Sequence, residues 1–373
     1  MAAMRVLVIG GGVNGLATAD ALAGAGAQVT VLERHTVGHA WASSHGLSRA
    51  IRHEYGPQAI YTRMVARSLR LWADLARETG RHLYTETGVL TLGYTDDGQT
   101  VAGYETMRAE GLPVDLLPPD VCERRFPQFR VGAHTAITYN PVGGMMHASE
   151  CLAALSERLR ARGGEIREGV AVAHVDPHGD HGRVTLADGT TLEADRVVVT
   201  AGPWVHDVLQ ELALPIRATR QQVCYFAGLA PELFGLGRFP VFLSEMHYYG
   251  FPMARTNWLK IASHMIGANV DPNMPYLPDE AEVAAVRAFL RETIPAAAEA
   301  ELAGVDCCMY DLSPDEDLIL DVHPGGAGVI IGSGFSGHGF KFGIVTGELL
   351  ASLALGTPPR FPLAGFRLAR FTA

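Results

Sequence analysis

Three glycines close to the start of the sequence, Gly10, Gly12 and Gly15, have the spacing G-x-G-x-x-G, which is typical of a loop that binds a pyrophosphate. The first glycine makes a tight turn, the second lets the backbone approach the phosphates, and the third lets a helix pack closely on a strand. Glu33, 18 residues after Gly15, stands where this fold presents a carboxylate to ribose hydroxyls. The pattern predicts a dinucleotide site and does not distinguish FAD from NAD. The alternative is a glycine-rich turn in an ordinary βαβ unit.

Two cationic residues that lie far apart in the sequence, Arg52 and Lys341, are candidates for binding a carboxylate. A guanidinium donates two parallel N–H bonds to a carboxylate, and a lysine adds a point charge. Their meeting in space is a hypothesis, and the alternative for Arg52 is a surface salt bridge. Two cations in one pocket would also favour the neutral form of a bound amine. Lowering an amine pKa from ~10 to ~8 corresponds to ~3 kcal/mol.

A third cation, Lys260, stands in the strand-like segment WLKIASH, where alternation places Leu259 and Ile261 on one face and Lys260 on the other. If that other face meets solvent, Lys260 is a solvated charge. If it meets a cleft, its ammonium group can stabilise a negatively charged oxygen species. The alternation leaves both readings open.

Cysteine and histidine usage argues against metals and disulfides. The five cysteines form no C-x-x-C motif, so neither a disulfide framework nor a zinc site is expected. No pair among the 15 histidines has a convincing metal-ligand spacing, and we predict no metal. Cys307 and Cys308 are adjacent in the sequence, which sets this pair apart from the rest. The other cysteines, Cys122, Cys151 and Cys224, are expected to be small core residues.

The elements that position these residues follow from hydrophobic periodicity. Apolar runs at Val6–Ile9 and Val29–Leu32 flank an alanine-rich helix, which gives a strand, glycine turn, helix, strand and acid in order. The segment 35–56 holds four histidines and two arginines with little periodicity, so we expect it to line something polar. A long amphipathic helix is predicted to begin near Pro57 and end near Gly80.

The rest of the chain alternates strands and helices. We predict helices at 100–110, from an N-cap at Ser149 to Ala161, at 204–212, at 278–298 and at 342–355. Strands are expected within 83–94, 136–139, 214–267, 318–321 and 328–331, with a three-strand meander before a buried strand at 197–200. The expected fold class is α/β (α+β), a Rossmann-like dinucleotide domain interleaved with a mostly antiparallel substrate domain. The dinucleotide domain would comprise 1–82, 147–214 and 306–373, and the substrate domain 83–146 and 215–305, with a cleft between them.

Composition excludes several classes of partner. A chain of 373 residues suits two domains, and 48% hydrophobic residues allow a substantial core. The net charge of -10 gives no electrostatic footprint for nucleic acid or for an anionic membrane surface. The apolar N-terminus lacks a basic region and has Gly10–Gly12 where a signal peptide would stay apolar, so a soluble cytoplasmic protein is expected.

The chain resembles one enzyme family over its whole length, and four segments carry the resemblance most clearly. SSHGLSRAIRHEYG (43–56), YYGFP…LK (248–260), CMY…SPDEDLILD (308–321) and GFSGHGFKF (334–342) are similar to stretches of monomeric sarcosine oxidase and N-methyltryptophan oxidase. These are FAD-dependent amine oxidases of the D-amino-acid-oxidase superfamily. The resemblance implies covalently attached FAD, a small N-methyl or cyclic amino acid as substrate, and oxygen as the acceptor that leaves as hydrogen peroxide. It also implies a monomer.

The resemblance also implies roles for individual residues. Cys308 would form the thioether link to the flavin, Arg52 and Lys341 would hold the substrate carboxylate, and Lys260 would lie where oxygen reacts. Arg49, Tyr249 and His264 would line the same pocket as catalytic or substrate-binding residues. The helix after the loop 332–339 would direct its N-terminus at the flavin, and no general base is needed for a neutral amine. The positions assigned to cofactor binding are Gly10, Gly12, Val13, Asn14, Gly15, Glu33, Arg34, Ser43, Ser44, Arg49, Val172, Ala201, Gly202, Trp204, Cys308, Gly334, Phe335, Gly337, His338, Gly339 and Lys341.

Several alternatives remain open at this stage. Leu47–Ser48 and the segment 253–258 depart from the pattern of sarcosine oxidases, which makes a bulkier substrate such as N-methyltryptophan, pipecolate or a proline-like acid the second interpretation. A dehydrogenase that passes electrons to a partner protein is a third. A nicotinamide-dependent reductase, or a flavin-binding protein without turnover, belongs to a different class; Cys308 and GFSGHGFKF favour the flavin enzymes.

Overall fold

The glycine motif directly follows an interior strand of a mostly parallel sheet in the computed structural model. The structure describes residues 3–96, 98–245, 247–264 and 267–371. Within these ranges six strands form this sheet, and all neighbours are parallel except β19 and β20. In order across the sheet they are β19 (Ile319–Val322), β20 (Val329–Ser333), β13 (Arg196–Val199), β1 (Arg5–Ile9), β2 (Gln28–Glu33) and β9 (Glu165–Glu168). The expected strand, glycine turn, helix and strand are confirmed.

Both faces of this sheet are covered, which explains its continuous apolar runs. Val6 and Val8 of β1 point to a layer of helices, whereas Leu7 and Ile9 point to an antiparallel meander. The helices are α1 (Val13–Gly24), α5 (Ala148–Ala161) and α9 (Gly343–Leu355), and the meander is β10 (Val172–His178), β11 (His181–Leu186) and β12 (Thr191–Ala194). The core of this half therefore has two layers, one on each side of the sheet.

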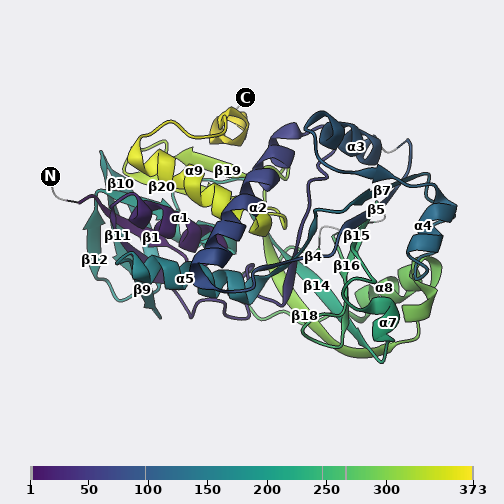
Figure 1. Cartoon of the computed structure of the whole chain (residues 1–373). Helices are drawn as coiled ribbons and strands as arrows, with labels where there is room; N and C mark the ends of the chain where they lie inside the picture. Colours follow the sequence, from purple (N-terminus) through teal and green to yellow (C-terminus); the bar gives the residue numbers. More distant parts are fainter. Residues whose placement is uncertain (1–2, 97, 246, 265–266, 372–373) are drawn as a thin grey trace.

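A second, mostly antiparallel sheet forms the other half of the molecule (Figure 1). Eight strands of the described chain take part, and β15 and β5 are the parallel neighbours. In order they are β18 (Glu301–Leu312), β14 (Arg217–Ala227), β17 (Leu259–Ser263), β16 (Tyr248–Phe251), β15 (Val241–Ser244), β5 (Val89–Gly93), β7 (Ala136–Asn140) and β6 (Asp115–Leu116). One face packs on a core with α4 (Pro119–Arg125), α7 (Pro231–Phe234) and α8 (Glu280–Thr293). Its other face is free to meet the first half.

The two halves are joined by a long helix and a small sheet. Helix α2 (Ala59–Thr79) runs between the halves in Figure 1 and ends at Gly80, whose φ of 67° is the left-handed conformation that glycine favours. The small sheet consists of β3 (Ser48–Ile51), β8 (Gly144–His147) and β4 (Tyr84–Glu86), and α3 (Gln99–Ala109) lies nearby over β5 and β7. None of the helices in the described ranges has the length and apolar character needed to cross a membrane.

Two sequence expectations are wrong at the level of single elements. The helix predicted at 204–212 is instead a 3₁₀ turn at Gly202–Trp204 followed by the short α6 (Val205–Val208), because Leu209 and Leu214 turn back into the core under the meander. Ser149 is not the N-cap of α5. His147 is the N-cap, because β8 leads directly into the helix. The N–H of His147 donates a hydrogen bond to the carbonyl of Leu83.

The proposed domain limits cut through two strands. β18 runs through residue 306, and β8 runs through the limit between 146 and 147. Cys308 therefore lies on a strand of the eight-stranded sheet, although the sequence grouped it with the dinucleotide domain. The limits themselves stay a prediction.

Candidate functional site

A cavity of about 850 Å³ lies where the carboxyl ends of β1, β2 and β13 meet the free face of the eight-stranded sheet. The residues that the sequence assigned to cofactor, substrate or catalysis all line this cavity, with the exception of Gly15 and Gly334. They come from widely separated segments of the sequence, and the fold brings them together around one cavity. This convergence makes the cavity the candidate site.

The glycine turn forms one end of the cavity. Gly10 has a φ of 101°, a conformation that side chains rarely adopt, and Gly12 is the N-cap of α1. The Glu33 carboxylate accepts hydrogen bonds from the N–H groups of Gly11 at 2.6 Å and His35 at 2.8 Å. Backbone at a helix N-terminus, with a fixed carboxylate beside it, suits the phosphates and ribose of a dinucleotide.

Gly15 and Gly334 act behind this wall. A Cβ at Gly15 would lie 1.9 Å from the carbonyl oxygen of Gly10 and 2.7 Å from Oγ1 of Thr200. Gly15 therefore allows α1 to approach the turn, as the third glycine of the motif does. Gly334 has a φ of 64° and packs against Ile216 and Ser313, so its part in the site is to turn the loop.

Gly15→Ala is expected to destabilise the protein by about 3 kcal/mol or more, because the new methyl group meets backbone that cannot move aside. Urea unfolding of the purified variant measures the change in free energy. Gly365→Ala is the matched control, since a Cβ there meets nothing within 4 Å. Equal stability of the two variants would contradict the packing argument.

The polar segment 35–56 lines the cavity, as the sequence predicted. Ser44 accepts a hydrogen bond from the N–H of Val13 at 3.0 Å, and Ser43 donates one to the carbonyl of Met309 at 2.6 Å. Arg49 donates to the carbonyl groups of Ser43, His45 and Ser48. These bonds fix the loop between the glycine turn and the eight-stranded sheet.

Lys260 points into the cavity, which decides between the two readings that the sequence left open. Its side chain is 5% exposed, and Nζ donates to the carbonyl of Ser48 at 2.9 Å and lies 4.6 Å from the centre of the Phe251 ring. Burial, with the charge of Arg49, lowers the pKa of Lys260 to about 7. The ammonium group is thus buried with few partners, and it would interact more strongly with an anion than an exposed lysine does.

Cys308 and Tyr310 line the cavity from β18, whereas the neighbouring Cys307 does not. This follows from the alternation of side chains along a strand. Burial raises the pKa of the Cys308 thiol, and the charges of Arg49 and Lys260 oppose that rise. Cys308 is the cysteine of the pair that can meet a group bound in the cavity.

Arg52 and Lys341 come together around Tyr55. The Arg52 guanidinium lies 4.5 Å from the centre of the Tyr55 ring, and Lys341 donates to the Tyr55 hydroxyl at 2.8 Å and to the carbonyl of His338 at 3.0 Å. Burial and the charge of Arg52 hold the pKa of Lys341 well below its usual value. Within the described ranges no hydrogen bond or ion pair occupies the Arg52 guanidinium, so this cationic corner suits a ligand carboxylate.

Two buried histidines at the site, His264 and His338, are neutral at physiological pH. Burial, with the charges of Arg52 and Lys341, lowers the pKa of His264 to about 4. Burial lowers the pKa of His338 to about 3, and its Nε2 donates to the carbonyl of Glu316 at 2.9 Å, as expected of a ring held by the backbone. The rings of Tyr249 and His264 pack edge to face with their centres 6.3 Å apart, and both residues line the cavity.

Sequence reasoning missed many residues of the cavity wall, and Glu54 and Thr91 are two of them. Glu54 is part of the RHEYG stretch, and a lone acid between basic and aromatic residues was the available signal. Thr91 gave none, because a threonine in the strand VLTLG is ordinary strand composition.

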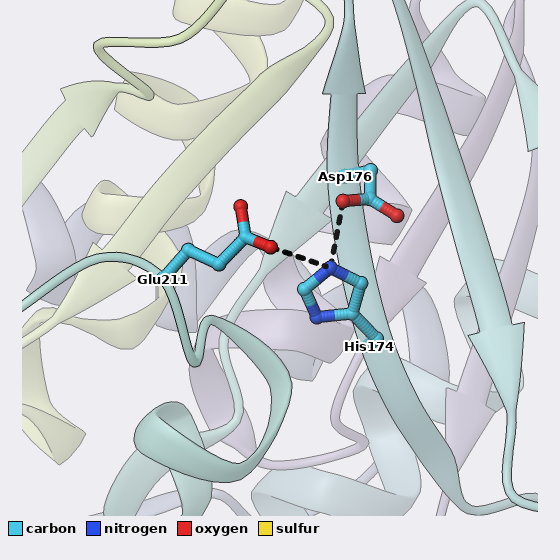
Figure 2. A group of neighbouring side chains, drawn as sticks. All are labelled: His174, Asp176 and Glu211. Atoms are coloured by element: carbon cyan, nitrogen blue, oxygen red, sulfur yellow. Dashed lines mark hydrogen bonds and ion pairs between the residues drawn. The ribbon is translucent and has the colours of Figure 1, made fainter.

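A separate group of possible metal ligands lies off the cavity (Figure 2). His174 Nε2 is 2.6 Å from a carboxylate oxygen of Asp176 and 4.0 Å from one of Glu211, which comes from the chain after α6. The Glu211 side chain is 82% exposed. Solvated groups of this kind form weak ion pairs without any ion, and we assign no metal to them.

The chain is similar to known proteins over nearly its whole length. Residues 5–353 match the family model described as FAD dependent oxidoreductase. Monomeric sarcosine oxidase of Bacillus sp. (strain B-0618) is 34% identical over 98% of this chain and 95% of its own. N-methyl-L-tryptophan oxidase of Salmonella typhi is 31% identical over 98% and 99%. The structure of NikD, an unusual amino acid oxidase essential for nikkomycin biosynthesis, superposes with a TM-score of 0.83 at 25% identity over 98% of each chain.

Proposed function

Because this chain belongs to the family of FAD dependent oxidoreductases, we propose that it is an amine oxidase that acts on a small secondary amino acid such as sarcosine. The C–N bond is oxidised to an imine, and oxygen takes the two electrons and two protons to leave as hydrogen peroxide. Water then hydrolyses the imine, which gives formaldehyde and glycine when sarcosine is the substrate. The observation that carries this proposal is one cavity that is lined both by the glycine turn and by the cationic pair Arg52 and Lys341.

The residues present fit FAD. The backbone at Gly10 and Gly12 is open to the cavity, and a Cβ at Gly12 would meet the Oγ of Ser44 at 3.3 Å and narrow the phosphate cradle. The Glu33 carboxylate would accept hydrogen bonds from the ribose hydroxyls, and Cys308 is the candidate for a thioether link to the flavin. Bound FAD would supply the two-electron chemistry. Family membership favours it over a nicotinamide cofactor.

The cationic corner would bind and orient the substrate. Arg52 would donate two parallel bonds to the carboxylate and Lys341 a third, which holds the neighbouring amine at a fixed place. The charges of Arg52 and Lys341 also favour the neutral amine, whose lone pair must be free when hydride leaves the adjacent carbon. No side chain has to remove a proton first, in keeping with the neutral, backbone-held His338.

Arg52→Ala is expected to raise the KM for sarcosine by about 10- to 100-fold, which is the cost of one lost charge-assisted interaction. Initial rates of peroxide release over a range of sarcosine concentrations measure it. Arg63→Ala is the control, because Arg63 pairs with Glu110 outside the cavity. A KM that stays the same in Arg52→Ala would count against carboxylate capture.

The finer assignments belong to the same proposal. A bulkier secondary amino acid is the second candidate substrate, because the cavity wall continues from Arg52 to Thr91 and Thr138. A panel of N-methyl and cyclic amino acids in the peroxide assay separates these candidates. A dehydrogenase would show reduction of bound flavin without consumption of oxygen. A monomer in the cytoplasm is also proposed, and gel filtration tests the first of these properties.

A further inference from the structure

Glu54 is a buried acid on the cavity wall that the proposed reaction does not use. The residue is 9% exposed, and within the described part of the chain no hydrogen bond to either carboxylate oxygen has regular geometry. The Asn140 amide and the N–H groups of His53 and Glu54 lie close enough to act on the carboxylate weakly. Burial raises the pKa of Glu54, and the charge of Arg52 opposes that rise, yet no ion pair within 4.0 Å joins the two side chains. A buried carboxylate with such weak hydrogen bonding is costly, so a ligand that supplies well-placed donors would be bound strongly.

Thr91 has an unused polar group on the same wall. The residue is 7% exposed, and its Oγ1 has no hydrogen-bond partner among the residues that the structure describes. Thr91 of β5 pairs directly with Thr138 of β7, and both line the cavity. On its other side Thr91 pairs with Leu243 of β15, which pairs with Tyr249 of β16. A row of side chains thus runs from the apolar centre of the cavity to a hydroxyl-bearing end.

Glu54 adjoins this end of the row. Asn140 stands two residues from Thr138 on β7, so both side chains are on the same face of the sheet. The Asn140 amide nitrogen lies 3.3 Å from Nδ1 of His53, the residue before Glu54. The same Asn140 side chain hydrogen-bonds weakly to the Glu54 carboxylate, which opposes the rise in the pKa of Glu54. Arg52 and Glu54 are both on the cavity wall and are separated by one residue. A ligand held at Arg52 therefore has Glu54 within reach of a short side chain.

Three other acids of the cavity, Glu245, Asp311 and Glu33, differ from Glu54 because they already have hydrogen-bond partners. Glu245 accepts a hydrogen bond from the Thr100 hydroxyl at 3.0 Å. Asp311 accepts one from the N–H of Phe335 at 3.2 Å, and Glu33 accepts two from backbone N–H groups. Glu54 is thus a cavity acid that the surrounding fold gives no regular hydrogen bond and no ion pair within the described residues.

We propose that Glu54 and Thr91 form a distal subsite that binds a hydrogen-bond-donating group at the end of the substrate side chain. This inference rests on the proposed function and refines it: the preferred substrate is a secondary amino acid whose side chain ends in a hydroxyl, amide or ammonium group. The carboxylate oxygens of Glu54 accept from that group, and the Thr91 hydroxyl completes its bonding. Leu243 and Tyr249 cover the apolar stem between the two ends.

Binding of acids that cannot be oxidised tests the subsite without catalysis. Isothermal titration of the purified holoenzyme would compare pentanoate with 5-hydroxypentanoate and 5-aminopentanoate, and the same sets of four and six carbons. The wild type is expected to bind the best donor-bearing acid about tenfold more tightly than the plain acid of equal length, as for one charge-assisted hydrogen bond. Glu54→Leu is expected to remove that preference, and Thr91→Val to reduce it.

Two matched variants separate the subsite from other effects. Glu54→Gln keeps an acceptor and the shape, so it should fold and retain part of the preference for a hydroxyl group. Glu245→Gln removes a charge from the same cavity and should leave the preference unchanged. Equal affinities for paired acids in the wild type, a preference that survives Glu54→Leu, or an equal loss in Glu245→Gln would overturn the subsite.

The failure of this inference and that of the proposed function are distinguishable. A clear binding preference together with no oxidation of any secondary amino acid would remove the proposed function alone. Oxidation of sarcosine with no preference among the paired acids would remove the subsite alone. If none of the acids binds to the wild type, both the subsite and carboxylate capture at Arg52 are overturned.

Discussion

Lys260→Met is expected to slow the reaction of the reduced enzyme with oxygen by about 100-fold or more, while reduction by substrate changes far less. Oxygen becomes negatively charged when it takes the first electron, and a buried ammonium group stabilises that charge. Removing one such preorganised donor from a dry site costs about two to three powers of ten in rate. Nζ of Lys260 contacts Ser48 and Phe251 in the cavity and forms no ion pair within 4.0 Å among the residues described, although the more distant charge of Asp306 acts on it.

Stopped-flow spectroscopy separates the two half-reactions, since the flavin absorbance falls with substrate and returns with oxygen. Lys260→Arg keeps the charge and is the control. In the wild type the oxygen step should also slow as pH rises through about 7, because the ammonium loses its proton there, and this dependence should be absent from Lys260→Met. Equal slowing of both half-reactions by Lys260→Met would refute the assigned role.

Cys308→Ser is expected to abolish retention of flavin after precipitation in acid. The wild type should give a yellow pellet, because a thioether to Cys308 survives denaturation, and the variant should release all of its FAD into the supernatant. Cys307→Ser is the matched control: it changes the adjacent residue of β18, whose side chain does not line the cavity, and should keep the yellow pellet. Colourless wild-type pellets with free FAD would exclude the covalent link.

The dinucleotide half was predictable from sequence because its signals are local. The apolar runs at β1 and β2, the glycines between them and Glu33 follow one another within a single βαβ unit. The helix at 204–212 was not predictable in the same way. Its apolar residues suit a helix, but the core under the meander pulls Leu209 and Leu214 out of helical register.

The site was predictable in its residues but not in its geometry. Resemblance named Lys260, yet its direction depends on the pairing of β17 with β14 and β16, which alternation alone does not give. Arg52 and Lys341 meet because Tyr55 lies between them, a contact across 286 positions of sequence for Tyr55 and Lys341. The sequence did not single out Glu54, because its poor hydrogen bonding depends on the residues that surround it in the folded protein. Thr91 and Asn140, which come from distant strands, are among the residues of that region.

The strand that carries Cys308 belongs to the eight-stranded sheet, whereas the turn that faces the phosphates belongs to the six-stranded sheet. A cofactor joined to Cys308 and gripped at Gly10 would act as a crosslink between the two halves of the molecule. Separation of the two halves would then require release of the diphosphate. The cofactor would therefore limit how far the cavity can open when substrate enters. The prosthetic group would serve as a structural brace as well as a reagent.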